Sequence, residues 1–228
     1  MSLLKSLYNK LKDNSDKNFQ RIDLNHNSTL NDCDWLNHIY ISPSIRYGHL
    51  EYFKGSNDKV EVVHCVFYPS YFKALPIFGY DVISLGGKIT GIFCDYTPCP
   101  FHNMILHSAI SRVNSDLKHL HRELPGWTDF FSPEFIAISP ENEYEKAEFL
   151  CSSLFELFVK YSQIVDTNNM FLGNEEVTAH IKGQNEYSLG QRKNSKTQKA
   201  LAKYIGEEES IKFIENVLFP AYQQVTNI

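Results

Sequence analysis

Residues 62–81, VVHCVFYPSYFKALPIFGYD, predict a buried strand, a turn with two prolines, and the start of a second strand. Each predicted strand carries an ionisable residue where the local pattern is apolar. His64 alternates with Val62 and Val66, so its imidazole lies on the apolar face of the first strand. Asp81 ends the apolar run LPIFGY of the second strand. Both side chains are therefore candidates for the edge of an apolar pocket.

His64 and Asp81 form a candidate proton-transfer pair. A histidine and a carboxylate beside an apolar pocket can fix each other's protonation state, and desolvation favours the neutral, proton-donating carboxyl group. The alternative is that His64 is a hydrogen-bonded core histidine and that Asp81 is a turn or capping residue. That alternative is the commoner role of each residue type.

Length and composition indicate one domain over residues 1–228, because 228 residues with 43% hydrophobic content can bury a sizeable core. A net charge of −5 gives no overall reason to bind nucleic acid or an acidic membrane. No apolar run reaches the about 18 residues that a membrane span requires. The cysteines form no CxxC pair and are odd in number, so we expect no disulfide framework, no metal site and a reducing, cytoplasmic setting. They are Cys33, Cys65, Cys94, Cys99 and Cys151.

Turn residues divide much of the remaining chain into strands. Two hairpins are predicted, at 48–54 with 59–68 around GSND, and at 81–85 with 88–94 around Gly86-Gly87. Single short strands are predicted at 35–41 and 135–138. Sequential strands joined by tight turns form an antiparallel sheet.

Apolar residues at helical spacing predict helices at 2–12, 106–120 and 147–161, and the segment 175–220 is mainly helical. Residues 13–18 are predicted to be a polar linker. Helices before, between and after the strands predict an α/β fold, a three-layer α/β/α sandwich with a central antiparallel sheet flanked by helices.

His49 and Glu51 lie two residues apart in the first hairpin and therefore point to one face of the sheet. If the register allows, His64 on the paired strand shares that face. The alternative is an exposed hairpin with charged side chains in water, which is the commoner case for a glutamate in a strand.

Residues 182–203 form a basic segment in an acidic chain. Its single acidic residue is Glu186, and its cations are Lys182, Arg192, Lys193, Lys196, Lys199 and Lys203. One interpretation is a solvated helix face. The other is a docking surface for an acidic electron-carrier protein, because complementary charge speeds the encounter and orients the partner.

Six motifs, which lie between residues 46 and 222, are together similar to the ferredoxin-dependent bilin reductases. They are RYGHLEYFK, VVHCVFYP, LPIFGYDV, HRELPGWTDFFSPEF, QRKNSKTQKAL and ENVLFPAY. Members of this family reduce the open-chain tetrapyrrole biliverdin with single electrons from a [2Fe-2S] ferredoxin and carry no cofactor of their own. The resemblance therefore implies a radical mechanism, biliverdin IXα as substrate and ferredoxin as partner. We expect the protein to be a monomer.

The resemblance also implies roles for individual residues. Asp81 matches the central aspartate that protonates the bilin, and His64 matches the histidine that shares a proton with it. Glu51 matches a carboxylate near the vinyl group of the D ring, and His49 is the histidine two residues before it.

Three further residues match positions that bind the pigment in the family. Arg122 and Lys196 match cations that meet the bilin propionates, and Asn194 matches a pocket residue. Without the resemblance, Arg122 would be interpreted as half of a surface ion pair, for example with Glu123.

Ser195 departs from the family, because most members have an aspartate at or near this position. A hydroxyl group cannot replace a carboxylic proton donor. The hairpin also has one extra residue between Glu51 and His64, which would change the direction of Glu51 if it shifted the register.

Glu51 favours phycocyanobilin as the product. Ser195, the short chain and the composition rich in Lys, Asn and Ile instead resemble a viral branch that makes phycoerythrobilin by way of 15,16-dihydrobiliverdin, in the cytoplasm of an infected host cell. We expect phycoerythrobilin. The alternatives from other classes are a bilin carrier that does not reduce its pigment, and a structural protein with a core histidine.

Overall fold

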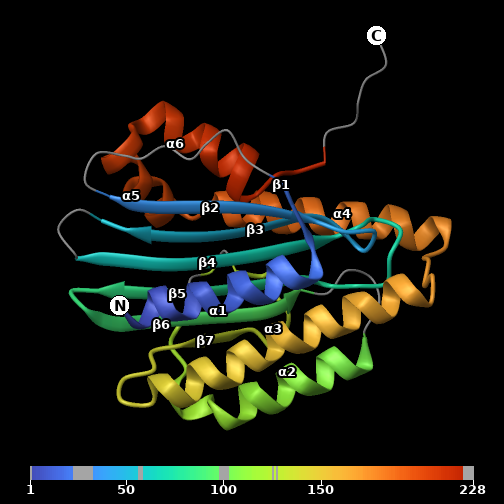
Figure 1. Ribbon diagram of the computed structural model, residues 1–228, viewed down its shortest axis with the longest axis horizontal. Helices are drawn as coiled ribbons and strands as arrows, with labels where there is room; N and C mark the ends of the chain where they lie inside the picture. Colours follow the sequence, from blue (N-terminus) through green and yellow to red (C-terminus); the bar gives the residue numbers. More distant parts are fainter. Residues whose placement is uncertain are drawn as a thin grey trace.

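The computed structural model describes residues 2–22, 33–55, 59–97, 103–124, 126 and 128–222. Seven strands form one sheet in which each strand pairs antiparallel with the next along the chain (Figure 1). The strands are β1 (Gln20–Ile22), β2 (Asp34–Ile41), β3 (Ile45–Lys54), β4 (Val60–Pro69), β5 (Ile77–Leu85), β6 (Lys88–Thr97) and β7 (Ile136–Ile138).

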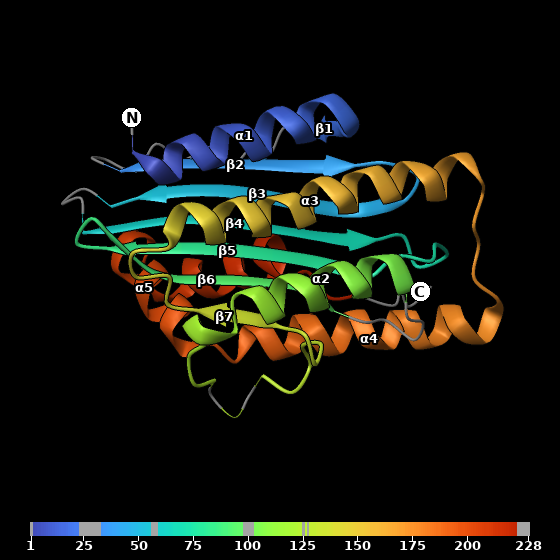
Figure 2. The same ribbon diagram turned by 90° about the horizontal axis from the view of Figure 1, so that it is seen from below.

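Helices cover both faces of the sheet (Figures 1 and 2). One face carries α1 (Leu3–Asn18), α2 (Met104–Asp116) and α3 (Tyr144–Thr167). The other carries α4 (Asn174–Arg192), α5 (Ser195–Ile205), α6 (Glu207–Phe213) and a π-helical turn (Ile214–Leu218). The predicted three-layer sandwich is confirmed. Within the described ranges, no helix is both long enough and apolar enough to cross a membrane.

Alternation along the strands gives the two faces of the sheet different cores. Tyr8 of α1, Phe67 and Phe78 of the sheet, and Phe158 of α3 belong to the larger core, on the α1–α3 side. The α4–α6 side has a smaller apolar cluster. Buried histidine and carboxylate side chains interrupt that second face, namely His49, Glu51 and His64.

The predicted hairpins are confirmed, apart from residues 56–58 of the first turn, which lie outside the described residues. β3 pairs with β4, and β5 pairs with β6. Gly86 and Gly87 turn the second hairpin with φ values of 58° and 77°. A two-residue turn that needs positive φ at both positions favours glycine at each, since glycine lacks the Cβ that clashes there.

The first helix is longer than predicted, because residues 13–18 continue it instead of forming a linker. Local polar contacts support this extension. Lys12 Nζ lies 2.7 Å from Asp16 Oδ2 one turn later, and Ser15 Oγ donates to the Leu11 carbonyl at 2.9 Å. Asp16 also accepts a hydrogen bond of 2.9 Å from Tyr40 of β2. The extension over residues 13–18 therefore depends on polar contacts, whereas the predicted helix over residues 2–12 depended on an apolar repeat. The exposed three-residue strand β1 was also not predicted.

A buried carboxyl group fastens the segment before β7 to β6. Asp95 is 1% exposed, and its Oδ2 accepts from the Ser132 amide at 2.9 Å and from Thr97 Oγ1 at 2.7 Å. The Ser132 hydroxyl donates to its other oxygen. Burial raises the pKa of Asp95 from its usual value to about 6, against the effect of these donors.

Asp95→Asn is expected to make the protein more stable than the parent above pH 7, by up to about 3 kcal/mol. The pKa of Asp95 is higher in the folded state than in the unfolded state. Its contribution to the free energy of unfolding is therefore complete below the unfolded pKa and is lost as the pH rises through about 6. The amide carries no charge, so the variant avoids that loss. Urea unfolding of both proteins at pH 5 and pH 8 measures the difference. A difference in stability that is the same at both pH values would contradict this account.

Candidate functional site

Five side chains form one row across the sheet, on the face covered by α4–α6. Register pairs Asn37 of β2 with Glu51, Glu51 with His64, His64 with Asp81, and Asp81 with Phe93 of β6. Directly opposed residues of antiparallel strands point to the same face. The predicted shared face of Glu51 and His64 is confirmed, and the extra hairpin residue does not turn Glu51 away. We call Asn37, Glu51, His64, Asp81 and Phe93 the site row.

His64 and Asp81 are in direct contact at the middle of the site row. His64 Nδ1 lies 2.5 Å from Asp81 Oδ1. Burial opposes charge on His64, but the Asp81 carboxylate, its hydrogen bond and then Glu51 together raise the pKa of His64 above its usual value. His64 Nε2 is buried and has no hydrogen-bond partner among the described residues. The pair therefore holds a proton and has an unused nitrogen for a ligand.

His49 lies two residues before Glu51 on β3, on the same face of the sheet as the site row, and is fully buried. Its Nε2 is 3.0 Å from Asn37 Oδ1. A carboxamide oxygen can only accept, so Nε2 carries the hydrogen and Nδ1 is a bare acceptor. Burial, and then the charges of His64 and His38, lower the pKa of His49 well below its usual value. Nδ1 also has no partner within the described part of the chain. His49 is thus a neutral hydrogen-bond acceptor.

Glu51 closes one end of the group of ionisable side chains. It is 5% exposed, and its Oε1 accepts a hydrogen bond from the indole N–H of Trp35. Burial raises the pKa of Glu51, while His64 and the Trp35 hydrogen bond oppose that rise and Asp81 adds to it.

The other end of the site row is open. The side chain of Asp81 is 33% exposed, against 9% for His64. Beyond Asp81, the guanidinium carbon of Arg122 lies 5.5 Å from the centre of the Phe93 ring. Arg122 is exposed, and its Nη1 is 3.5 Å from the Thr90 carbonyl. Solvent therefore reaches the site row at the Asp81 end, where Arg122 supplies a cation.

The C-terminal residues 213–220, which we call the cover, lie over the closed part of the site. The Phe219 ring meets His64 edge to face, with 5.6 Å between centroids. The Phe213 ring is 6.3 Å from His49 and 4.8 Å from Trp35. The cover keeps water away from the histidines.

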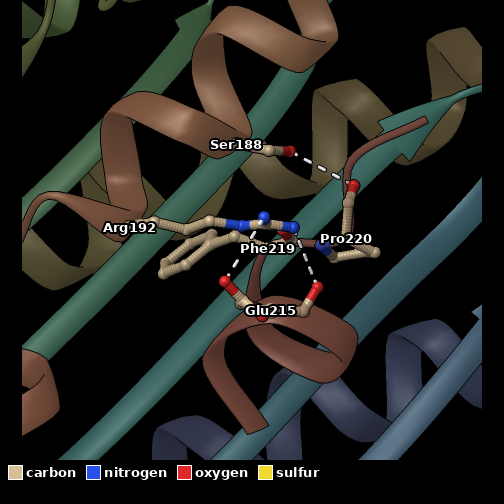
Figure 3. Close-up of polar contacts among 5 residues, drawn as sticks. All are labelled: Ser188, Arg192, Glu215, Phe219 and Pro220. Atoms are coloured by element: carbon tan, nitrogen blue, oxygen red, sulfur yellow. Dashed lines mark hydrogen bonds and ion pairs between the residues drawn. The ribbon is translucent and has the colours of Figure 1, made fainter. Parts of the chain in front are cut away.

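Arg192 of α4 fastens the cover through backbone carbonyls (Figure 3). Its Nε and Nη2 donate to the Phe219 carbonyl at 3.1 and 2.8 Å, and Nη2 also donates to the Glu215 carbonyl at 3.0 Å. Ser188 donates to the Pro220 carbonyl at 3.2 Å. Arg192 was predicted as part of the basic docking segment. That assignment is corrected, because the guanidinium binds the cover and its side chain is only 22% exposed.

Arg192→Gln is expected to speed hydrogen exchange of the backbone amides of residues 217–219 by about 10- to 100-fold, since hydrogen bonds from a charged donor contribute about 1.5–3 kcal/mol each. The matched control is Lys193→Gln, which removes the neighbouring exposed cation and should leave exchange in the cover unchanged. Hydrogen–deuterium exchange followed by mass spectrometry measures both variants. Equal protection of the cover in the parent and in Arg192→Gln would show that Arg192 does not fasten it.

The two remaining predicted residues lie at the start of α5. The Asn194 side chain accepts from the Lys196 amide at 3.2 Å and so caps this helix. Lys196 and Ser195 are exposed. The structure therefore gives Asn194 a capping role, and its predicted part in a pocket, like that of Lys196 at a propionate, stays a prediction.

Several residues that build the site were not predicted from the sequence. Trp35 and Asn37 alternate along β2 and contact the two site residues of β3, but the sequence around them carries only a weak strand pattern. Gly79 faces the site two residues before Asp81, and a Cβ there would lie 3.0 Å from the Tyr187 hydroxyl. One signal in the sequence identifies Trp35 and Asn37. They alternate along β2, and pairing of β2 with β3 places them on the same face as His49 and Glu51.

The sequence pattern of the family described as "Ferredoxin-dependent bilin reductase" matches residues 14–220. The chain is similar to phycocyanobilin:ferredoxin oxidoreductase of Prochlorococcus marinus (strain MIT 9515), at 27% identity over 184 residues, which are 80% of this chain and 76% of that protein. It is 29% identical over 187 residues to the enzyme of the same name from Synechococcus elongatus (strain ATCC 33912 / PCC 7942 / FACHB-805), covering 80% of this chain and 74% of that protein.

Two solved structures share the fold. PcyX superposes with a TM-score of 0.64 at 21% identity, over 96% of this chain and 99% of that one. Phytochromobilin synthase from tomato, solved in complex with biliverdin, gives a TM-score of 0.72 at 15% identity, over 98% and 85% of the two chains. The family pattern spans most of the chain, including every residue of the site row, and this protein therefore belongs to the ferredoxin-dependent bilin reductases.

Proposed function

We propose that this protein reduces biliverdin IXα by four electrons to phycoerythrobilin, by way of 15,16-dihydrobiliverdin. It is then an oxidoreductase that acts on CH–CH groups and takes electrons from an iron–sulfur protein. The observation that carries the proposal is the His64–Asp81 contact of 2.5 Å beside a buried histidine nitrogen with no partner in the described chain. Membership of the family supplies the reaction class.

Biliverdin fits the chemistry of this face of the sheet. The pigment is a long, flat, conjugated molecule with two carboxylates, so it needs an apolar slot, cations at the rim and a few buried proton donors. We expect the apolar cluster under α4–α6 to line the slot and the site row to supply the donors. Arg122 at the open end is our candidate for one propionate, and Lys196 for the other.

Each electron makes the pigment more basic, and a positioned acid then protonates it at once. The proton held between His64 and Asp81 is the first to be delivered. Asp81 is partly exposed, so solvent returns a proton to the pair before the next electron arrives. Four electrons from four reduced ferredoxins and four protons from solvent complete the balance, and two C=C bonds of the pigment are reduced without loss of any atom.

The choice of product depends on two positions. We assign Glu51 to the D-ring end of the pigment, where a donated proton allows reduction of the vinyl group. Ser195 lacks the carboxyl group of most family members, and this departure favours phycoerythrobilin. Phycocyanobilin is the second candidate, because Glu51 lies directly opposite His64 in the site row.

Ferredoxin is the proposed electron donor, and the protein needs no bound cofactor because each electron arrives from outside. Exposed lysines at Lys182, Lys193, Lys196, Lys199 and Lys203 form the proposed docking surface for this acidic partner. Arg192 is not part of this proposed surface, because its guanidinium group binds the cover. We place the reaction in the cytoplasm, with the protein acting as a monomer.

An anaerobic assay tests the proposal. The protein is incubated with biliverdin IXα, ferredoxin, ferredoxin reductase and NADPH, and the pigments are separated by chromatography. We expect phycoerythrobilin, with two NADPH consumed for each pigment. Phycocyanobilin at the same stoichiometry would show that the second candidate is the product. Biliverdin that binds but stays unreduced would overturn the enzyme and favour a carrier.

A further inference from the structure

We propose that Trp35 is a positioning residue that determines the product. Its indole N–H holds the Glu51 carboxyl group as a hydrogen-bond acceptor. Glu51 therefore does not deliver a proton to the D-ring end of the pigment. This inference rests on the proposed function, because it concerns the proton that Glu51 is assigned to deliver. It explains how a chain that carries Glu51 forms phycoerythrobilin.

The geometry aims the indole at Glu51. Trp35 lies on β2 directly opposite Phe53, so Glu51 is its diagonal neighbour on the same face. Diagonal neighbours lie within reach of an aromatic side chain. The indole Nε1 donates to Glu51 Oε1, and both side chains are buried, at 6% and 5% exposure.

Two aromatic rings hold the indole in this orientation. The Phe53 ring meets it edge to face at 6.1 Å and 89°, and the Phe213 ring of the cover at 4.8 Å and 61°. A donor whose rotamer is locked by packing loses little entropy on forming its hydrogen bond, so the contact is preorganised. β2 makes a second contact of this kind where Asn37 fixes the hydrogen of His49.

The indole has only a donor, so the oxygen that it meets must accept. Such a donor stabilises the ionised carboxylate. The titratable groups around Glu51 are His64 and Asp81 of the site row and His49 beside it. His64 favours the carboxylate, Asp81 and burial favour the neutral acid, and the Trp35 hydrogen bond acts with His64. Removing the N–H therefore shifts Glu51 toward a protonated form that can donate.

Trp35→Phe keeps an aromatic ring at this position and removes the N–H. In the protein without pigment or ferredoxin, we expect the pKa of Glu51, followed by NMR of ¹³C-labelled glutamate carboxyl groups, to rise by about one unit, as the loss of one such hydrogen bond requires. In the anaerobic assay, the ratio of phycocyanobilin to phycoerythrobilin should rise about tenfold. Adding Glu51→Gln to Trp35→Phe should abolish this increase.

The control is Tyr204→Phe, which removes a hydroxyl group from a ring 4.8 Å from Phe53 and keeps Trp35 and both rings that hold its indole. It should leave both the pKa of Glu51 and the product ratio near those of the parent. An unchanged pKa in Trp35→Phe, or an equal shift in Tyr204→Phe, overturns the proposal. The NMR experiment needs no turnover, so it stands even if the parent protein fails to reduce biliverdin, and the two failures can be told apart.

Discussion

Asp81→Asn is expected to bind biliverdin normally and to complete its reduction about 10²- to 10⁴-fold more slowly, the range for loss of a positioned general acid. The amide keeps the shape of the side chain and its place opposite His64, but it cannot transfer a proton. The first electron still reaches the pigment, and the radical then waits for a proton from a less favourable donor. We therefore expect a long-lived radical absorbance after addition of reduced ferredoxin.

Stopped-flow absorbance under anaerobic conditions follows this radical. The matched control is Asp95→Asn, which makes the same replacement at a buried aspartate outside the site row. Ser132 and Thr97 donate hydrogen bonds to that aspartate. This control should turn over at the rate of the parent. Full turnover by Asp81→Asn without a persistent radical would remove Asp81 from the mechanism.

His64→Gln is expected to reduce turnover about 100-fold and to remove one limb of the pH profile. Asp81 and Glu51 raise the pKa of His64, so the parent pair stays protonated above the usual histidine value of about 6.5. Turnover by the parent should therefore fall only when the pH rises through this higher pKa. The variant has no imidazole to deprotonate, and this decline should be absent.

Single-turnover rates from pH 5.5 to 9, with pigment and ferredoxin saturating, measure the two profiles. Glutamine keeps a hydrogen-bonding side chain of similar reach, so loss of packing contributes little to the result. A parent profile that declines below pH 6.5, or an identical decline in His64→Gln, would contradict the assigned role.

Much of the fold could be predicted, because the sheet depends on patterns that are local in sequence. The alternation around His64 placed it on one face, the glycine pair at residues 86–87 specified the second hairpin, and the apolar repeats located the long helices. Residues 13–18 were predicted wrongly as a linker. Their helix depends on polar contacts, among them one between Asp16 and Tyr40 of a different element.

The site was predictable only in part for a related reason. A strand pattern tells which residues share a face, so Glu51, His64 and Asp81 could be grouped before the structure. It does not tell which side-chain atoms meet across the chain. The indole donor of Trp35 and the role of Arg192 as a fastener both depend on tertiary contacts. In the sequence, Arg192 is indistinguishable from the exposed lysines that follow it.

The central claim is that the pigment binds on the site row and receives its protons from His64 and Asp81. A crystal structure of the protein with biliverdin tests it most directly. We predict the pigment on the α4–α6 face of the sheet, with a pyrrole nitrogen or lactam oxygen within about 3 Å of both His64 Nε2 and the Asp81 carboxyl group. Biliverdin bound elsewhere, with His64 and Asp81 out of hydrogen-bonding distance of it, would contradict the claim.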